Sequence, residues 1–287
     1  MKRYIFILGM LLSFNATAAH NCGDDLGNNC WDCSKTEADL CTARKTGKEL
    51  SITGTGQMKD YILSGRGDGA VSDSPWGTDI TKVVIGEGIT TIGDDAFIGA
   101  VNLEDVQIAS SVTTVGHEAF YHTGIQNLVL SDSIDTIENY AFQRCYDLVA
   151  LVIPSSVTSL GEITFENSSG TIYCAKPAEN ESSPCEGKQA TNLKYYTKDE
   201  NTGIYEVDGA YYADVNLLAK GQACENKAQC DKMVLSVKRG IPFEFKGKFY
   251  TSFGDIATDN YIHKRIYTVD EANMLSGKKN TLKIRYK

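Results

Sequence analysis

The sequence predicts a mostly β fold, in which a short solenoid of stacked repeats is followed by a small β-rich module with some α-helix. Two observations carry this prediction. Residues 80–174 consist of four copies of one phrase of 22–23 residues, and after them the period stops and a tyrosine-rich segment begins. A fixed period in the low twenties is the mark of a solenoid, because one such repeat cannot bury its own apolar face and must stack on its neighbours.

Each copy of the phrase carries one phenylalanine and two aliphatic residues in the same phase. The three sets are Phe97, Phe120, Phe142, Phe165; Ile85, Ile108, Leu130, Ile153; and Ile92, Val115, Ile137, Leu160. Within the second copy, the alternation Val106-Gln107-Ile108 has the period of a strand. We therefore expect each repeat to form two short extended segments and a bend whose centre the phenylalanine fills.

The phrase resembles a known family. Copies such as LEDVQIASSVTTVGHEAFYHTG match the pattern L-x-x-V-x-I-P-x-x-V-T-x-I-G-x-x-A-F-x-x-C, which is similar to the BspA-like leucine-rich repeats of bacterial surface and secreted proteins. Pro154 and Cys145 fall on positions of this pattern, whereas Thr164 replaces the last alanine. The resemblance implies a leucine-rich-repeat solenoid that is used for adhesion or protein contact, and it implies no catalytic site.

Residues 1–19 have the form of a secretory signal peptide. Lys2 and Arg3 precede the apolar stretch 4–14, and Ala16-Thr17-Ala18 offers a small-residue cleavage site. We expect a secreted or cell-surface protein, with the periplasm as the alternative location, and no transmembrane segment in the mature chain. The formal charge of −9 argues against nucleic-acid binding, which requires a basic surface.

The cysteines fall into two clusters and one isolated position. Clustered cysteines of an exported protein are usually disulfides, although eight of them allow 105 pairings. The expected disulfide cysteines are Cys22, Cys30, Cys33, Cys41, Cys174, Cys185, Cys224 and Cys230. Two alternatives stay open for the N-terminal cluster, namely a zinc site on its four thiolates and a redox pair formed by Cys30 and Cys33. Cys145 lies inside the solenoid and is expected to be a buried free thiol.

We divide the region before the repeats into a cysteine-rich segment, 20–48, and a cap with a loop, 49–79. Leu50 and Ile52 predict a strand that covers the open edge of the first coil, and Trp76 is expected to cover the same end. The loop contains Arg66, Gly67 and Asp68, a triplet that can pair with an integrin-type receptor. The alternative is chance, since glycine and aspartate are common in turns.

The candidate binding surface of the solenoid is the outward side of its first strands. Its predicted residues are Lys82, Val84, Asp105, Gln107, Asn127, Val129, Ala150 and Val152. A second outward row consists of the hydroxyl residues Thr91, Thr114, Thr136 and Ser159. The alternative interpretation of both rows is an ordinary solvated sheet.

Catalysis is not expected, and neither a cofactor nor a metal ion is predicted. His117 and His122 are five positions apart, whereas the zinc-protease motif needs a step of four so that both share a helix face. Acidic pairs such as Asp94-Asp95 are expected to be solvated turn residues.

The region after the repeats is predicted to contain a polar linker, 175–191, and a β-rich module, 192–287. Asp208-Gly209 predicts a hairpin turn between residues 204–207 and 210–213. Further strands are expected at 195–196 and 240–250, a short helix at 214–222, a helix at 268–275, and a closing strand at 280–286.

Taken together, these patterns predict an exported, non-enzymatic protein that binds a protein ligand, such as an extracellular-matrix or host surface protein, through the strand face of the solenoid. The alternative is a periplasmic or cell-surface structural scaffold without a host ligand. No pattern in the sequence indicates an oligomeric state.

Overall fold

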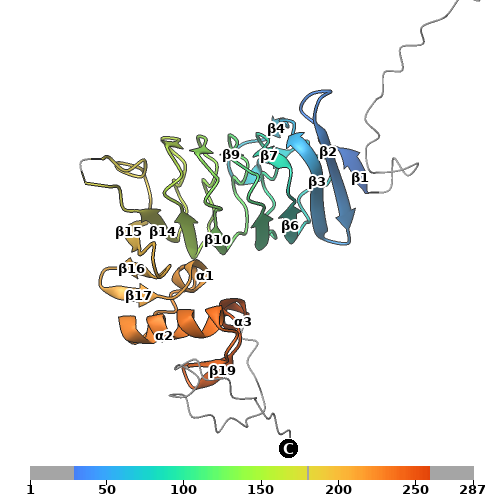
Figure 1. Ribbon diagram of the computed structural model, residues 1–287. Helices are drawn as coiled ribbons and strands as arrows, with labels where there is room; N and C mark the ends of the chain where they lie inside the picture. Colours follow the sequence, from blue (N-terminus) through green and yellow to red (C-terminus); the bar gives the residue numbers. More distant parts are fainter. Residues whose placement is uncertain (1–28, 180, 259–287) are drawn as a thin grey trace, which may run out of the picture. The chain divides into compact units, whose positions relative to one another are not determined.

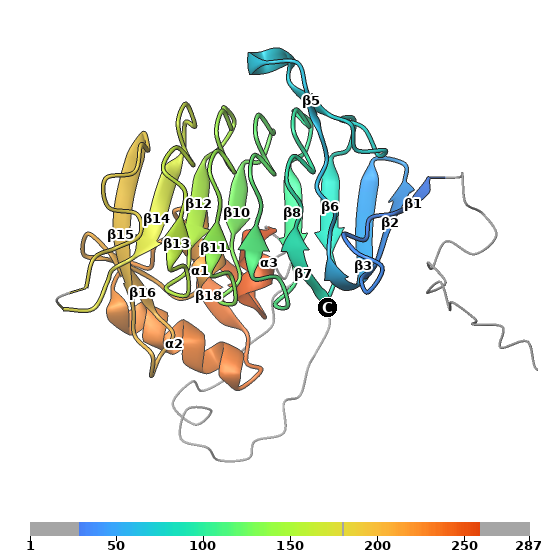
Figure 2. The same ribbon diagram turned by 90° about the horizontal axis from the view of Figure 1, so that it is seen from above.

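The computed structural model describes residues 29–179 and 181–258 (Figures 1 and 2). The chain divides into two compact units, which we call the solenoid unit (Met1–Ile172 and Pro177–Leu193) and the C-terminal unit (Tyr173–Lys176 and Lys194–Lys287). The signal peptide, Cys22, the helix at 268–275 and the strand at 280–286 lie outside the described residues and stay predictions.

The described part of the solenoid unit begins with an antiparallel meander, of which the sequence predicted only one strand. β1 (Cys30–Asp32) pairs with β2 (Leu40–Thr46), which pairs along its whole length with β3 (Glu49–Gln57). The strand at Leu50 and Ile52 was expected, but β1 and β2 were not. The described part of the cysteine-rich segment, residues 29–48, is thus part of the cap.

β3 joins the cap to the repeats because its other edge pairs in parallel with two strands of the first coil. Residues Glu49–Ile52 pair with β6 (Lys82–Ile85), and Gly56 and Gln57 pair with β7 (Ile89–Ile92). One strand therefore covers the open edges of both sides of the first coil, which would otherwise offer unpaired backbone to other chains.

The four predicted copies form successive coils whose strands run side by side (Figure 2). On one side, β6 pairs in parallel with β8 (Asp105–Ile108), and β10 (Asn127–Val129) pairs in parallel with β12 (Ala150–Ile153). On the other side, β7 is followed by β9 (Thr114–Val115), β11 (Thr136–Ile137) and β13 (Ser159–Leu160). The register of the second side aligns Thr91, Thr114, Thr136 and Ser159, as the repeat step predicts.

The phenylalanines form the stacked centre of the coils. The ring centroids of Phe97 and Phe120 lie 5.2 Å apart and those of Phe120 and Phe142 lie 5.5 Å apart, with the second pair nearly parallel. Trp76 continues this stack, since its centroid lies 5.8 Å from that of Phe97 and its Nε1 donates a hydrogen bond to the Ala96 carbonyl at 3.1 Å. Trp76 therefore covers the N-terminal end of the core, as expected.

A column of small residues follows the phenylalanines. Thr123, Cys145 and Ser168 occupy equivalent positions, are all buried, and each donates its side-chain hydrogen to the carbonyl of a phenylalanine. Cys145 is a free thiol, as predicted. Burial raises the pKa of this thiol to about 11, so it is protonated at neutral pH.

Two short segments extend from the coils. Between the cap and the first coil, β4 (Leu63–Ser64) and β5 (Val71–Ser72) form a small hairpin around a 3-10 turn at Gly67–Gly69. After the fourth coil, β14 (Thr171–Ala175) begins in the solenoid unit and ends in the C-terminal unit.

Within its described residues, the C-terminal unit contains a three-stranded antiparallel sheet, a separate hairpin and three helices. β15 (Asn192–Lys198), β16 (Tyr205–Val207) and β17 (Ala210–Tyr212) form an antiparallel sheet. The turn between β16 and β17 is the predicted Asp208-Gly209, with both residues at positive φ. A second hairpin joins β18 (Phe243–Phe245) to β19 (Lys248–Tyr250). α1 (Val215–Ala219) matches the expected short helix, and α3 (Phe253–Ala257) closes the described part.

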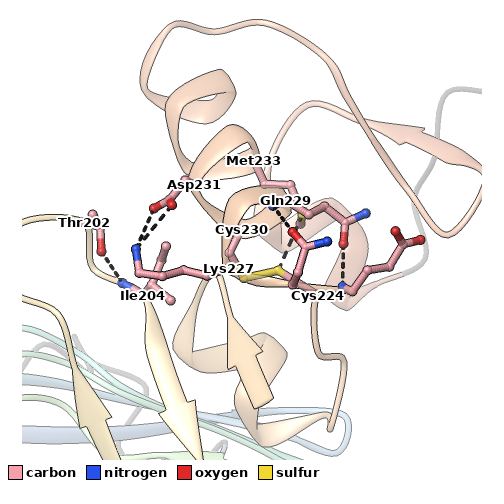
Figure 3. Close-up of a disulfide and its surroundings, with 10 residues drawn as sticks. Thr202, Ile204, Cys224, Lys227, Gln229, Cys230, Asp231 and Met233 are labelled. Carbon is pink, nitrogen blue, oxygen red and sulfur yellow. Dashed lines mark hydrogen bonds and ion pairs between the residues drawn. A yellow bond between two sulfur atoms is a disulfide. The ribbon is translucent and has the colours of Figure 1, made fainter. Parts of the chain in front are cut away.

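The twelve-residue helix α2 (Lys227–Lys238) was missed by the sequence analysis. Its start is fixed by local contacts: the Asn226 side chain accepts a hydrogen bond from the Gln229 amide, and Lys227 pairs with Asp231 one turn on (Figure 3). The Cys224–Cys230 disulfide ties its first turn to the preceding loop. Met233 and Cys230 are buried in the core of this unit, together with Phe243 and Tyr250.

Within residues 29–179 and 181–258, no helix has the length and apolar character needed to cross a membrane.

Candidate binding surface

The first half of the predicted strand face is open to solvent. Asp105 and Gln107 are exposed on β8, and Lys82 and Val84 are half-exposed on β6 while Val83 and Ile85 point into the core. This half of the face therefore has the inside–outside alternation that the sequence predicted.

The open residues form a linked polar row. Lys82 Nζ lies 3.4 Å from Glu49 Oε1 on β3 and 4.0 Å from Asp105 Oδ2 on β8, so one cation bridges three neighbouring strands. The Gln107 side-chain amide donates a hydrogen bond to Asp105 at 3.3 Å. The row offers a partner both charges, amide and hydroxyl groups, and the apolar side chain of Val84.

In the second half of the face, the prediction is wrong for two residues. Ala150 and Val152 are each 2% exposed, so neither presents a surface to a partner. The reason is visible in the strand itself: β12 reads Ala-Leu-Val-Ile and is apolar on both faces, a pattern typical of a strand that is buried on both. Asn127 and Val129 are half-buried.

We therefore restrict the candidate surface to three strands and call it the open strand face. Its residues are Ser51 and Thr53 on β3, Lys82 and Val84 on β6, and Asp105 and Gln107 on β8. Ser51 and Thr53 were not anticipated, although the alternation in Leu50-Ser51-Ile52-Thr53 contained the signal.

The Arg66-Gly67-Asp68 triplet lies at the tip of the β4–β5 hairpin, but its carboxylate is engaged within the chain. Arg144 Nη1 lies 2.6 Å from Asp68 Oδ1, and the Tyr146 hydroxyl donates to the same oxygen at 3.1 Å. These two contacts hold the pKa of Asp68 below its usual range. A receptor that bound this carboxylate would have to displace both partners.

All described cysteines except Cys145 are disulfide-bonded. Cys33 is bonded to Cys41 and Cys224 to Cys230, and Cys30, Cys174 and Cys185 are disulfide-bonded as well. Because Cys33 bonds to Cys41, it cannot form the alternative redox pair with Cys30. The same bonds leave these sulfurs unable to act as the thiolates of a zinc site.

The fold also brings together three side chains that no sequence pattern grouped. Asp95, His117 and Glu118 are each half-buried, and their ligand-type atoms lie within 4.8 Å of one another. The repeat period could have indicated that two of them are neighbours, because Asp95 and Glu118 occupy equivalent positions 23 residues apart.

Comparison with known proteins finds similar repeats. A family model described as "BspA type Leucine rich repeat region (6 copies)" matches residues 76–179. A comparison with curated proteins found no match.

Several solved structures are similar in part. A leucine-rich repeat protein from Eubacterium ventriosum shares 25% identity, with 63% of this chain and 48% of that chain covered and a TM-score of 0.45. A leucine-rich repeat protein from Bacteroides ovatus shares 19% identity over 52% of this chain and 42% of that chain, with a TM-score of 0.38. A leucine-rich cell surface protein from Faecalibacterium prausnitzii shares 17% identity over 63% of this chain and 60% of that chain, with a TM-score of 0.29. The chain thus aligns with less than two thirds of each of these proteins.

Proposed function

Because residues 76–179 form a BspA-type leucine-rich repeat region, we propose that this chain is an exported, non-enzymatic protein that binds another protein through the open strand face. Stacked repeats build a rigid, extended surface, which is the usual way in which solenoids bind their partners. The protein class we propose as partner is an extracellular-matrix or host surface protein.

The observation that carries the proposal is the position of the exposed polar row. Lys82, Asp105 and Gln107 lie on adjacent strands whose backbone is fixed by parallel pairing on both edges of β6. The spacing between these side chains is therefore set by the sheet rather than by flexible loops, so little ordering entropy is lost when a partner binds.

A typical protein interface buries about 800 Å² on each partner. Three strands spaced about 4.8 Å apart span only roughly 10 Å across the sheet. We therefore expect the open strand face to be the centre of a larger contact to which the cap contributes.

The test is the binding of the oxidised full chain to immobilised matrix proteins, with fibronectin and fibrinogen as the probes. We expect saturable binding that weakens at least about tenfold, or about 1.4 kcal/mol, in the double variant Asp105→Lys, Gln107→Lys. The matched control is the double variant Asp135→Lys, Thr158→Lys, which adds the same charge at two exposed residues beside β11 and β13 and should leave binding unchanged.

Equal losses in the two variants would remove the open strand face from the proposal, because the effect would then follow charge alone. Absence of binding by the wild-type chain would contradict the matrix-protein proposal and favour the alternative, a structural scaffold of the periplasm or cell surface.

A further inference from the structure

Asp95, His117 and Glu118 meet on the bend that follows the second strand of each coil. Asp95 belongs to the first coil, and His117 and Glu118 belong to the second. Asp95 and Glu118 both adopt positive φ, 57° and 51°, as does Tyr140 at the equivalent position of the third coil. The Asp95 amide donates to the His117 carbonyl at 2.9 Å, which holds the two bends against each other. The side chains therefore project from a repeated and rigid backbone.

The carboxylate of Asp95 is only partly satisfied. Its Oδ2 accepts a hydrogen bond from the Leu63 amide at 3.1 Å, but its Oδ1 is buried and accepts none among the described residues. The Asp95 side chain is only 14% exposed, and His117 Nδ1 lies 4.0 Å from the unsatisfied Oδ1. A buried oxygen without a partner is costly, so a native structure that keeps one needs a reason.

The carboxylates of Asp95 and Glu118 lie close together, with ligand-type atoms within 4.8 Å of each other and of the His117 imidazole. Asp94 adds a further negative charge, although its Oδ1 already accepts a hydrogen bond from the His117 amide. A bound cation would neutralise the negative charge of these carboxylates. It would also bind the Asp95 Oδ1 atom, which accepts no hydrogen bond among the described residues.

We propose that Asp95, His117 and Glu118 form a binding site for one divalent transition-metal ion, with zinc as the best fit. Imidazole together with carboxylate is a donor set that zinc accepts, with bonds of about 2.0–2.2 Å. Calcium prefers six to eight oxygen ligands and magnesium prefers oxygen ligands, so one imidazole and two carboxylates suit either of them less well.

The geometry needs only a small adjustment. A tetrahedral ion with bonds of this length separates its ligand atoms by roughly 3.4 Å. The three donor atoms already lie within 4.8 Å of one another. The Glu118 side chain has three rotatable bonds, and His117 is 40% exposed, so both can turn toward Asp95 while water completes the coordination.

A bound metal ion would crosslink parts of the solenoid unit. The ion would join the first coil, through Asp95, to the second, through His117 and Glu118. Because Asp95 also holds the Leu63 amide of the β4–β5 hairpin, the hairpin would be fixed to the same point.

The experiment is a calorimetric titration of zinc chloride into the oxidised full chain near neutral pH, after removal of metals with a chelator. We expect one saturable equivalent, and an unfolding temperature that rises with zinc. Asp95→Asn and His117→Gln should each weaken this binding at least about tenfold, because each removes one of three ligands. Glu118→Gln serves as a third variant if either of these fails to fold.

The matched control is His122→Gln, which removes a half-buried imidazole five residues away and leaves all three ligands in place. It should bind zinc as the wild type does. The proposal is overturned if the wild type shows no saturable zinc binding, if the binding survives both Asp95→Asn and His117→Gln, or if calcium binds the site more tightly than zinc.

Discussion

Phe120 is the residue on which the packing of the coils depends most. Its ring is fully buried, and it is stacked between Phe97 and Phe142 at centroid distances of 5.2 and 5.5 Å. Each coil contributes one ring, and no coil has a core of its own. Loss of one ring therefore removes contacts from both neighbouring coils.

We predict that Phe120→Ala lowers the free energy of unfolding by about 3–5 kcal/mol, because the cavity lies where two stacked neighbours cannot collapse into it. The measurement is urea denaturation with the disulfides intact. Gln107→Ala is the control, and this exposed substitution should change the free energy by less than about 0.5 kcal/mol. A loss below about 1 kcal/mol for Phe120→Ala would show that the stack does not carry the stability.

At the residue scale, the sequence predicted the core well, but it did not predict that Asp95, His117 and Glu118 meet. The phase of the phenylalanines was enough to predict their stacking, because a solenoid places equivalent residues directly above one another. The same rule places Asp95 beside Glu118. However, whether two acidic side chains diverge into solvent or converge depends on the positive φ of the bend, which no residue pattern indicated.

The buried strand residues show a second limit. Alternation predicted that Ala150 and Val152 point away from the coil core, but it could not reveal whether that outer side is covered. Only the uninterrupted apolar run in β12 indicated that this strand is buried on both faces.

Among the elements, the tip of the β4–β5 hairpin is held to the coils by a long-range contact at Asp68. Arg144 and Tyr146, which come from the third coil, both bind the Asp68 carboxylate at its tip. Arg144 also sits at positive φ, so its direction is set by the bend of the coil.

We predict that Arg144→Gln loosens this hairpin and accelerates tryptic cleavage after Arg66 severalfold, because the tip loses its ion pair and its charge-assisted hydrogen bond. Asp68→Asn should have a similar effect, and the double variant should be no faster than either single variant, since all three lose the same interaction. Additive effects would show that the two residues act independently.

The pH dependence of the hairpin follows from the same pair. Arg144 holds the pKa of Asp68 below its usual range. The contribution of the pair is therefore complete at neutral and mildly acidic pH, and it is lost as the pH falls through this lowered pKa. Hydrogen exchange of residues 62–73, corrected for intrinsic rates, should show wild type and Arg144→Gln converging only at that acidic limit.

At the element scale, the predictions succeeded where local chemistry determines the structure. The Asp208-Gly209 hairpin was predicted because a two-residue turn at positive φ favours that pair. The helix α2 was missed because its start depends on the Asn226 cap and the Cys224–Cys230 disulfide, and a disulfide pairing is not readable from spacing. The strands β1 and β2 were missed for a similar reason, since the Cys33–Cys41 bond helps to define the meander.

At the scale of the whole molecule, the repeats form a rigid region that presents one open strand face. The cap contributes β3 to that face as well as covering the core, so its role extends beyond protection of the first coil. A partner is expected to contact the cap and the first two coils together.

The most direct test is site-specific photo-crosslinking to immobilised fibronectin or fibrinogen. A photoreactive residue placed at 107 lies on the open strand face. One placed at 158 lies directly before β13, on the second side of the coils. The account predicts crosslinks to the partner from position 107 and none from position 158. Crosslinks from position 158 alone would contradict the assignment of the open strand face as the binding surface.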